Sequence, residues 1–170
     1  LQGGEIDPAT TELAYTIAHC GDYNYFSFKG MRSKGNNELH VTSTHYDDQI
    51  ALDLVRGSQR TVAIHGCEGN ESVAYIGGSD DRLIELITES LEDIGISVRE
   101  APHHISGTQE NNIVNMTQTQ GGVQLELTAQ LRKELFKNRK SSRKNRENKD
   151  NWDDLMYDFA DAMKKAIERA

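Results

Sequence analysis

The sequence predicts an α/β domain with a mixed central sheet and helices on both faces of that sheet. Short apolar or β-branched runs alternate along the chain with amphipathic segments of helical period, which is the pattern of an α/β sandwich. The run 61–67 passes from small or β-branched residues into His65 and Gly66, as a buried strand does where it reaches the carboxyl edge of a sheet. With 170 residues, the chain is long enough for one domain with a proper core.

Local signals place the elements in chain order. Thr10 or Thr11 caps the first helix, which Gly21 ends. Thr44 caps the second helix, and Ser79 caps the third. A long loop precedes the last strand, and loops of that length are often functional. The strands are expected at 23–28, 61–67, 73–77, 96–101 and 122–127, the helices at 10–20, 44–55, 79–94 and 152–170, and the long loop at 102–121.

The last third of the chain is polar. Residues 137–150 are expected to form a mobile basic loop, in which cations alternate with serine and asparagine. Such a loop could capture a polyanion, or it could be a solvated linker. The apolar stripe of 152–170 is expected to pack into the core as a C-terminal helix. We therefore expect a single domain over 1–170.

Composition argues against several classes of function. The formal net charge is −8 and the pI is near 5.2, which argues against nucleic acid as a partner. No apolar run is long enough to cross a membrane, and no signal peptide is visible. Cys20 and Cys67 are too few for a disulfide framework. We expect the chain to be a monomer.

His65 is the first candidate for chemistry. Strand alternation places Ala63, His65 and Cys67 on one face of the sheet. The histidine could bind a metal, transfer protons, or be a core residue bonded to a backbone carbonyl. Cys67 could be a nucleophile with His65 as its base, an extra metal ligand or a packing residue.

Glu126 is the second candidate. It lies in the strand 122–127, where Val123, Leu125 and Leu127 share one face and Gln124 and Glu126 share the other. A carboxylate inside such a strand is costly to bury unless it is paired or near a cation, and beside a metal it could act as a general base. The alternative is an edge strand with one solvent-exposed face.

The start of the chain is the third candidate. Gly3 and Gly4 allow a tight backbone turn, and the carboxylates of Glu5 and Asp7 follow before the first helix. This pattern fits a metal-binding loop, and it fits an ordinary surface turn about as well.

Several blocks in a fixed order then identify a family. They are 28–31, 35–45, 63–67, 112–115 and 122–128 followed by Leu131 and Arg132. In these blocks the chain resembles the poly-γ-glutamate hydrolases of bacilli and their phages over nearly its whole length. These are zinc enzymes with a fold similar to that of zinc carboxypeptidases. A phage would use such an enzyme to strip the capsule of its host.

The resemblance implies a zinc site and reveals a departure from it. The family's His-x-Gly-x-Ile-Glu loop falls on this chain with Gln2 in place of histidine and Asp7 in place of glutamate, and the later zinc histidine falls on His65. Glutamine is a weak neutral oxygen donor for Zn²⁺. Glu5 is an alternative ligand, because it stands three residues after Gln2, the spacing of the carboxypeptidase His-x-x-Glu pair.

The resemblance also implies the remaining roles. Glu126 would be the general base. Arg132, Asn112, Asn115, His40 and His45 would contact the substrate. Where the family often has an arginine after the second asparagine, this chain has a methionine at position 116.

Zinc-dependent hydrolysis of γ-glutamyl amide bonds in poly-γ-glutamate is the function that the resemblance favours. A metal-poor, inactive domain that binds polyglutamate and a zinc deacylase of small acylated amino acids are the alternatives. The resemblance further implies a strand before Leu1, which we expect to be missing, so that Gln2 could mark a junction. We expect cytoplasmic synthesis, with release as a route to extracellular polymer.

Overall fold

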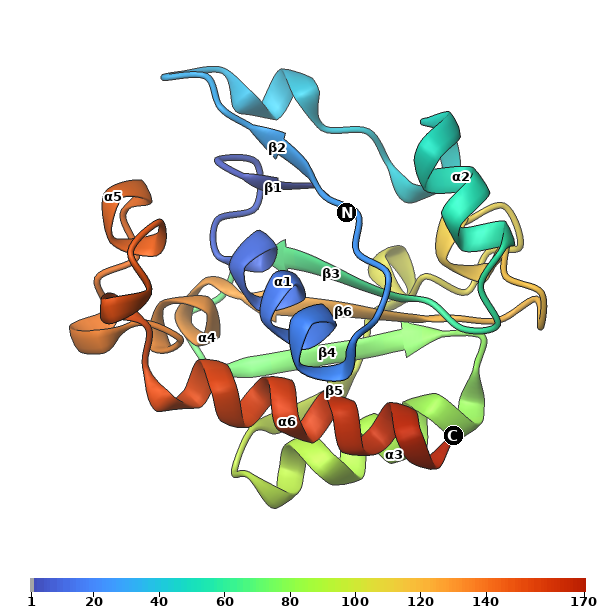
Figure 1. Cartoon of the computed structure of the whole chain (residues 1–170). Helices are drawn as coiled ribbons and strands as arrows, with labels where there is room; N and C mark the ends of the chain where they lie inside the picture. The colour runs from blue at the N-terminus through green and yellow to red at the C-terminus, as the bar shows by residue number, and fades with distance from the viewer. Residues whose placement is uncertain (1) are drawn as a thin grey trace.

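The computed structural model describes residues 2–170, and its centre is a four-stranded sheet in the order β3-β6-β4-β5 (Figure 1). β3 runs parallel to β6, β4 runs antiparallel to β6, and β5 runs parallel to β4. The predicted mixed sheet is therefore confirmed. β6 lies between β3 and β4, so Glu126 is not on the solvent-exposed face of an edge strand, and that alternative is wrong. The strands are β3 (Val62–Cys67), β4 (Val73–Gly78), β5 (Ser97–Glu100) and β6 (Val123–Thr128).

A second, two-stranded sheet lies beside the first. β1 (Gln2–Gly4) runs parallel to β2 (Phe28–Gly30). The sequence predicts a strand over 23–28, but the pairing begins only at Phe28. β1 offers partners to 28–30 alone, and within the described chain 24–26 makes no backbone hydrogen bond to another segment. The predicted strand preceding Leu1 lies outside the described residues.

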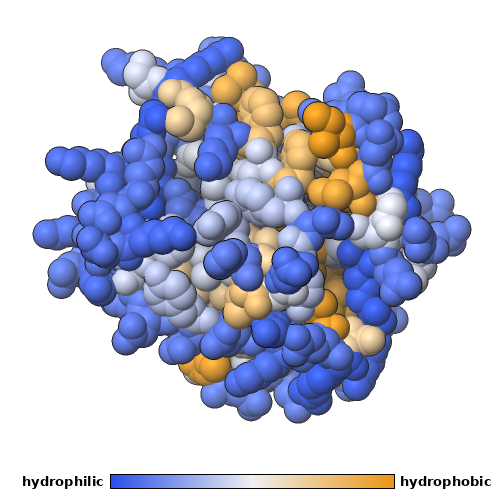
Figure 2. All heavy atoms as spheres, viewed as in Figure 1, coloured by the Kyte–Doolittle hydropathy of each residue, from blue (hydrophilic) through white to orange (hydrophobic). Residues whose placement is uncertain are grey.

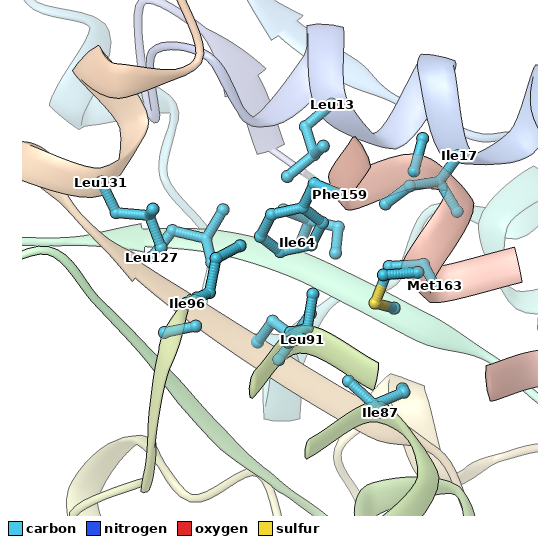
Figure 3. Packing of buried hydrophobic residues seen from close by; sticks show 14 of the residues in the cluster. Leu13, Ile17, Ile64, Ile87, Leu91, Ile96, Leu127, Leu131, Phe159 and Met163 are labelled. Atoms are coloured by element: carbon cyan, nitrogen blue, oxygen red, sulfur yellow. The ribbon is translucent and has the colours of Figure 1, made fainter. Parts of the chain in front are cut away.

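Three long helices cover one face of the central sheet. They are α1 (Thr10–Gly21), α3 (Asp81–Asp93) and α6 (Asp154–Arg169). Figure 3 shows how side chains of these helices meet Ile64 and Leu127 of the sheet in one buried core. The apolar stripe of the last helix is therefore core packing, as its period predicts.

The opposite face is covered by α2 (Gln49–Arg56) and by the 102–121 segment, which contains the 3-10 turns His103–Ile105 and Ile113–Asn115. Ala51, Val55 and Ile113 join these parts in a second buried cluster. Helices thus lie on both faces, as predicted.

The caps of three helices differ from the sequence prediction. α1 begins after Ala9, which makes no side-chain cap hydrogen bond, so neither Thr10 nor Thr11 is its cap. α2 begins after Asp48, whose carboxylate accepts from the Ala51 amide at 3.0 Å, and Ser43–His45 forms a separate 3-10 turn. Likewise Asp80, one residue after the expected cap, accepts from the Leu83 amide at 3.0 Å. For α2 and α3, a nearby aspartate supplies the cap in place of a hydroxyl residue.

The basic segment contains helical turns where the sequence suggests only a loop. After α4 (Ala129–Glu134), the chain forms the 3-10 turn Lys137–Arg139, α5 (Arg143–Arg146) and the turn Lys149–Asn151. Another 3-10 turn spans Asn36–Leu39. None of the helices in 2–170 has the length and apolar character needed to cross a membrane.

Candidate active site at the ends of β3 and β6

His65 and Glu126 are direct neighbours on adjacent strands. The parallel register of β3 and β6 pairs His65 with Glu126, and Tyr75 of β4 lies on the other side of Glu126. Residues paired in register project from the same face of a sheet. The two candidates, which are far apart in sequence, therefore stand side by side under the 102–121 segment.

His65 is a buried imidazole with an unused nitrogen. The residue is 6% exposed, and its Nε2 has no hydrogen-bond partner within the described chain. Burial, together with the nearby charge of His40, lowers the pKa of His65 to about 3. The ring is therefore neutral at physiological pH, and Nε2 is available to a ligand, because a buried nitrogen without a partner is costly.

Glu126 is a buried carboxyl held by an amide network. It is 7% exposed, and burial raises its pKa to about 8, with the charge of Asp7 adding to the effect. Glu126 Oε1 accepts from Gln124 Nε2 at 3.1 Å, and Gln124 Oε1 accepts from Asn112 Nδ2 at 3.1 Å. Gln124 thus fixes the orientation of Glu126. Gln124 is not among the predicted site residues, although its position on the same strand face as Glu126 was a signal in the sequence.

Asp7 is the carboxylate that the N-terminal loop brings to this site. The Gly66 amide donates to it, and the charge of Arg132 acts on it. Burial nevertheless raises the pKa of Asp7, since the two favourable contacts offset the loss of water only in part. Asp7 therefore lies at the end of β3, bonded to Gly66, which follows His65 in the chain, and its charge reaches Glu126.

An open imidazole near one buried and one partly buried carboxyl is the arrangement that the family resemblance predicts. Residues 1–162 match the family model described as poly-gamma-glutamate hydrolase. The chain belongs to this family.

Three relatives in Bacillus subtilis strain 168 carry the designation UPF0714. The SPbeta prophage-derived protein YoqZ is 36% identical over 136 residues, which is 79% of this chain and 49% of YoqZ. YndL is 30% identical over 80% of this chain and 54% of its own length. YmaC is 30% identical over 98% of this chain and 69% of its own length. The chain thus spans about half the length of the first two relatives.

Two solved structures share the fold. A bacteriophage poly-gamma-glutamate hydrolase superposes with a TM-score of 0.93 and 31% identity, over 99% of this chain and 82% of the phage protein. Zinc-free YndL superposes with a TM-score of 0.89 and 27% identity, over 98% of this chain and 82% of the YndL chain.

Two of the predicted zinc ligands have other partners in this member of the family. The Gln2 amide pairs with the backbone of Val41, since its Nε2 donates to the Val41 carbonyl and its Oε1 accepts from the Val41 amide at 2.8 Å. Glu5 forms an ion pair with Arg146. The structure therefore gives Gln2 and Glu5 roles in joining segments of the chain.

Arg132 is tied to the backbone. Its Nε donates to the Leu127 carbonyl at 3.1 Å, Nη1 to Pro8 at 2.9 Å and Nη2 to Cys67 at 3.1 Å. A guanidinium has five N–H groups, so this pattern uses three of them. Gly66 leaves room for this arrangement, because a Cβ there would lie 2.6 Å from Arg132 Cζ. Arg132 thus joins the ends of β3 and β6 to the loop that carries Asp7.

The other predicted substrate residues differ in their exposure and in how many of their polar atoms are already hydrogen-bonded. Asn115 Nδ2 donates to the carbonyls of Gly107 and Gln109 at 2.7 and 3.0 Å, while its buried Oδ1 has no partner within 2–170. His45 is exposed, and its Nδ1 lies 3.0 Å from the Thr42 hydroxyl. His40 is exposed, and its charge acts on both Asp7 and His65.

Cys67 does not have the properties of a nucleophile. Burial, with the charge of Glu126 next, raises the pKa of its thiol. A nucleophilic cysteine needs the opposite change, because the thiolate is the reactive form. This finding argues against the cysteine–histidine alternative.

Two side chains at this site carry donors of the kind that zinc favours. His65 Nε2 is open and buried, and Asp7 supplies a carboxylate, both of which zinc favours. Across residues 2–170, no three His, Cys, Asp or Glu side chains stand close enough together to hold a metal ion. Gln2 Oε1 keeps a second lone pair besides the one that accepts from the Val41 amide. The described residues therefore supply two of the donors that zinc favours, whereas a catalytic zinc site has three protein ligands.

Proposed function

We propose that this chain hydrolyses γ-glutamyl amide bonds in poly-γ-glutamate and that the reaction depends on zinc. The observation that supports this most is the pairing of His65 with Glu126, one offering an open nitrogen and the other a buried carboxyl. Membership of the poly-gamma-glutamate hydrolase family supplies the reaction class and the polymer. The solved YndL structure is described as zinc-free, and this supports zinc as the metal.

His65 and Asp7 would hold the zinc ion, with Gln2 as a weak third donor. When bound, zinc polarises the scissile carbonyl and lowers the pKa of a coordinated water. The substitution at position 2 weakens this site relative to one with two histidines, because an amide oxygen is neutral and a poor donor.

Glu126 would act as the general base. It accepts a proton as the water oxygen adds to the γ-carbonyl carbon, and it returns that proton to the nitrogen as the C–N bond breaks. The products are a carboxyl on one fragment and an amine on the other. In the zinc-free chain burial raises the pKa of Glu126 to about 8, whereas a base must start ionised, and the charge of a bound zinc ion would favour that ionised form.

The substrate would be held by polar groups around this pair. Asn115 Oδ1 is buried without a partner in the described chain and could accept from an amide N–H of the polymer. His40 and His45 would line the entrance. Arg132 would act through its charge, since the backbone already uses most of its donors.

Polymer size is the test. Poly-γ-glutamate is incubated with the chain in zinc or in chelator, and its length is followed by gel filtration. We expect shortening only with zinc, and none with the Glu126→Gln variant at equal zinc. Equal shortening in chelator would overturn the zinc dependence. No shortening under any condition would overturn the hydrolase proposal.

Polymer binding without hydrolysis is the second candidate, and one observation favours it. The two hydrogen bonds between Gln2 and Val41 occupy the side chain that stands where the family has a zinc histidine. In that case the chain retains the polymer at full length, and bound polymer is measurable by co-sedimentation. Release of Gln2 by a Gln2→His substitution would then create cleavage that the wild type lacks.

A further inference from the structure

A group of exposed cations lies beside the loop that carries Asp7. It consists of Lys29, Lys140, Arg143 and Lys144, and we call it the basic patch. We propose that the basic patch is a second subsite for poly-γ-glutamate, which binds carboxylates of the polymer beyond the bond that is cut. This proposal rests on the proposed function and adds to it the residues that would bind the polymer outside the catalytic site.

Contacts place two members of the basic patch, Lys29 and Arg143, beside the two N-terminal strands, and Lys140 and Lys144 lie in the same segment as Arg143. Lys29 pairs with Gly3 in the β1–β2 register, and its Cβ would lie 3.2 Å from a Cβ at Gly4. Arg143 Nη1 donates to the carbonyl of Met31, just beyond β2, at 3.5 Å. Figure 1 shows α5 beside β1 and β2. The patch therefore adjoins the backbone that leads directly to Asp7.

Arg146 fixes the segment that carries most of the patch. Its side chain is 3% exposed and forms an ion pair with Glu5, while its Nε lies 3.5 Å from Glu12 Oε1. Its Nη1 donates to the Ser141 carbonyl at 2.5 Å, and its own carbonyl accepts from Trp152 Nε1 at 2.8 Å. A buried charge removed from these partners would be costly, so α5 is held against the N-terminal loop.

The charge of this region contrasts with that of the whole protein. The chain has a net charge of −8, yet 137–149 contains seven Lys or Arg residues and a single acid, Glu147. The side of the molecule where α5 lies is hydrophilic in Figure 2. Lys140 and Lys144 are exposed and make no ion pair within 2–170. These charges are therefore available to a partner.

A polyanion that already enters the site is the partner that best matches this surface. Poly-γ-glutamate carries one carboxylate per residue, so a chain bound at Glu126 would extend further carboxylates along the protein. Cations placed close to that path attract them within a Debye length, which is about 8 Å at physiological salt. Such complementarity steers and orients a charged ligand.

The test compares two double substitutions that change the charge equally. Lys140→Gln with Lys144→Gln removes two cations of the patch. Arg56→Gln with Lys165→Gln removes two exposed cations from α2 and α6. Binding of fluorescent poly-γ-glutamate, of a γ-glutamyl trimer and of duplex DNA is measured by anisotropy at low and physiological salt.

We expect the patch variant to bind the polymer about fivefold more weakly than the control variant, with a flatter salt dependence. Binding of the trimer, which carries few carboxylates beyond the bond that is cut, should change far less than binding of the polymer. Equal polymer affinity in the two variants would overturn the patch while leaving the proposed function intact. Duplex DNA bound as tightly as the polymer would overturn its assignment to polyglutamate. A wild type that binds neither polymer nor trimer would overturn both proposals.

Discussion

Replacement of Glu126 by glutamine should stabilise the zinc-free protein at neutral and alkaline pH. The pKa of Glu126 is about 8 in the folded chain, against an ordinary value of 4.5. Folding therefore favours the protonated carboxyl. The stability that it contributes is fully present below about pH 4.5 and is lost as the pH rises through about 8.

The size of the effect follows from the difference between the two pKa values. Over the whole titration this difference corresponds to roughly 5 kcal/mol of folding stability, of which about 3 kcal/mol is lost by pH 7. Glutamine has nearly the same shape, and its Oε1 can still accept from Gln124 Nε2. The variant therefore removes the ionisation and retains the hydrogen bond.

Urea unfolding in chelator at pH 5 and pH 8 measures this effect. Between these values the wild type should lose about 3 kcal/mol more stability than Glu126→Gln. A Glu100→Gln variant, which removes an exposed carboxylate from β5, is the control and should follow the wild type. Equal pH dependence in the wild type and Glu126→Gln would refute the claim that Glu126 is buried and mostly protonated at neutral pH.

Three further predictions test other parts of the site. Gln2→His should tighten zinc binding by at least about tenfold in calorimetric titration, and an unchanged affinity would remove position 2 from the metal site. Gln124→Met removes a hydrogen bond to Glu126, so it should lower kcat and destabilise the fold by about 1–3 kcal/mol in urea unfolding. An unchanged kcat would show that the orientation of Glu126 does not depend on Gln124. Gly66→Ala should destabilise the fold by about 1–3 kcal/mol, because the added Cβ would meet the Arg132 guanidinium; a wild-type melting temperature would contradict this packing.

The fold was largely predictable because its strands and helices have strong periodic signals. Val123, Leu125 and Leu127 alternate with polar residues, and all three are buried against the helices. The strand over 23–28 was the main error in the fold. Its composition favours a strand, but a strand forms only where a partner is present, and β1 reaches only 28–30. Sequence periodicity does not contain that information.

The candidate site was predictable where a residue's own strand position determines its surroundings. His65 and Glu126 are of this kind, because each sits inside a short apolar strand. The partners of Gln2 and Glu5 were not predictable, since Val41 and Arg146 approach them from segments remote in the sequence. The same holds for Arg132, whose three carbonyl partners come from different parts of the chain.

Release of amine from a γ-glutamyl trimer tests the central claim most directly. The wild type and Glu126→Gln are compared at equal, saturating zinc, with binding of the trimer measured in parallel. We expect both proteins to bind the trimer equally and only the wild type to release amine. Amine release by Glu126→Gln at the wild-type rate would contradict the assignment of Glu126 as the base.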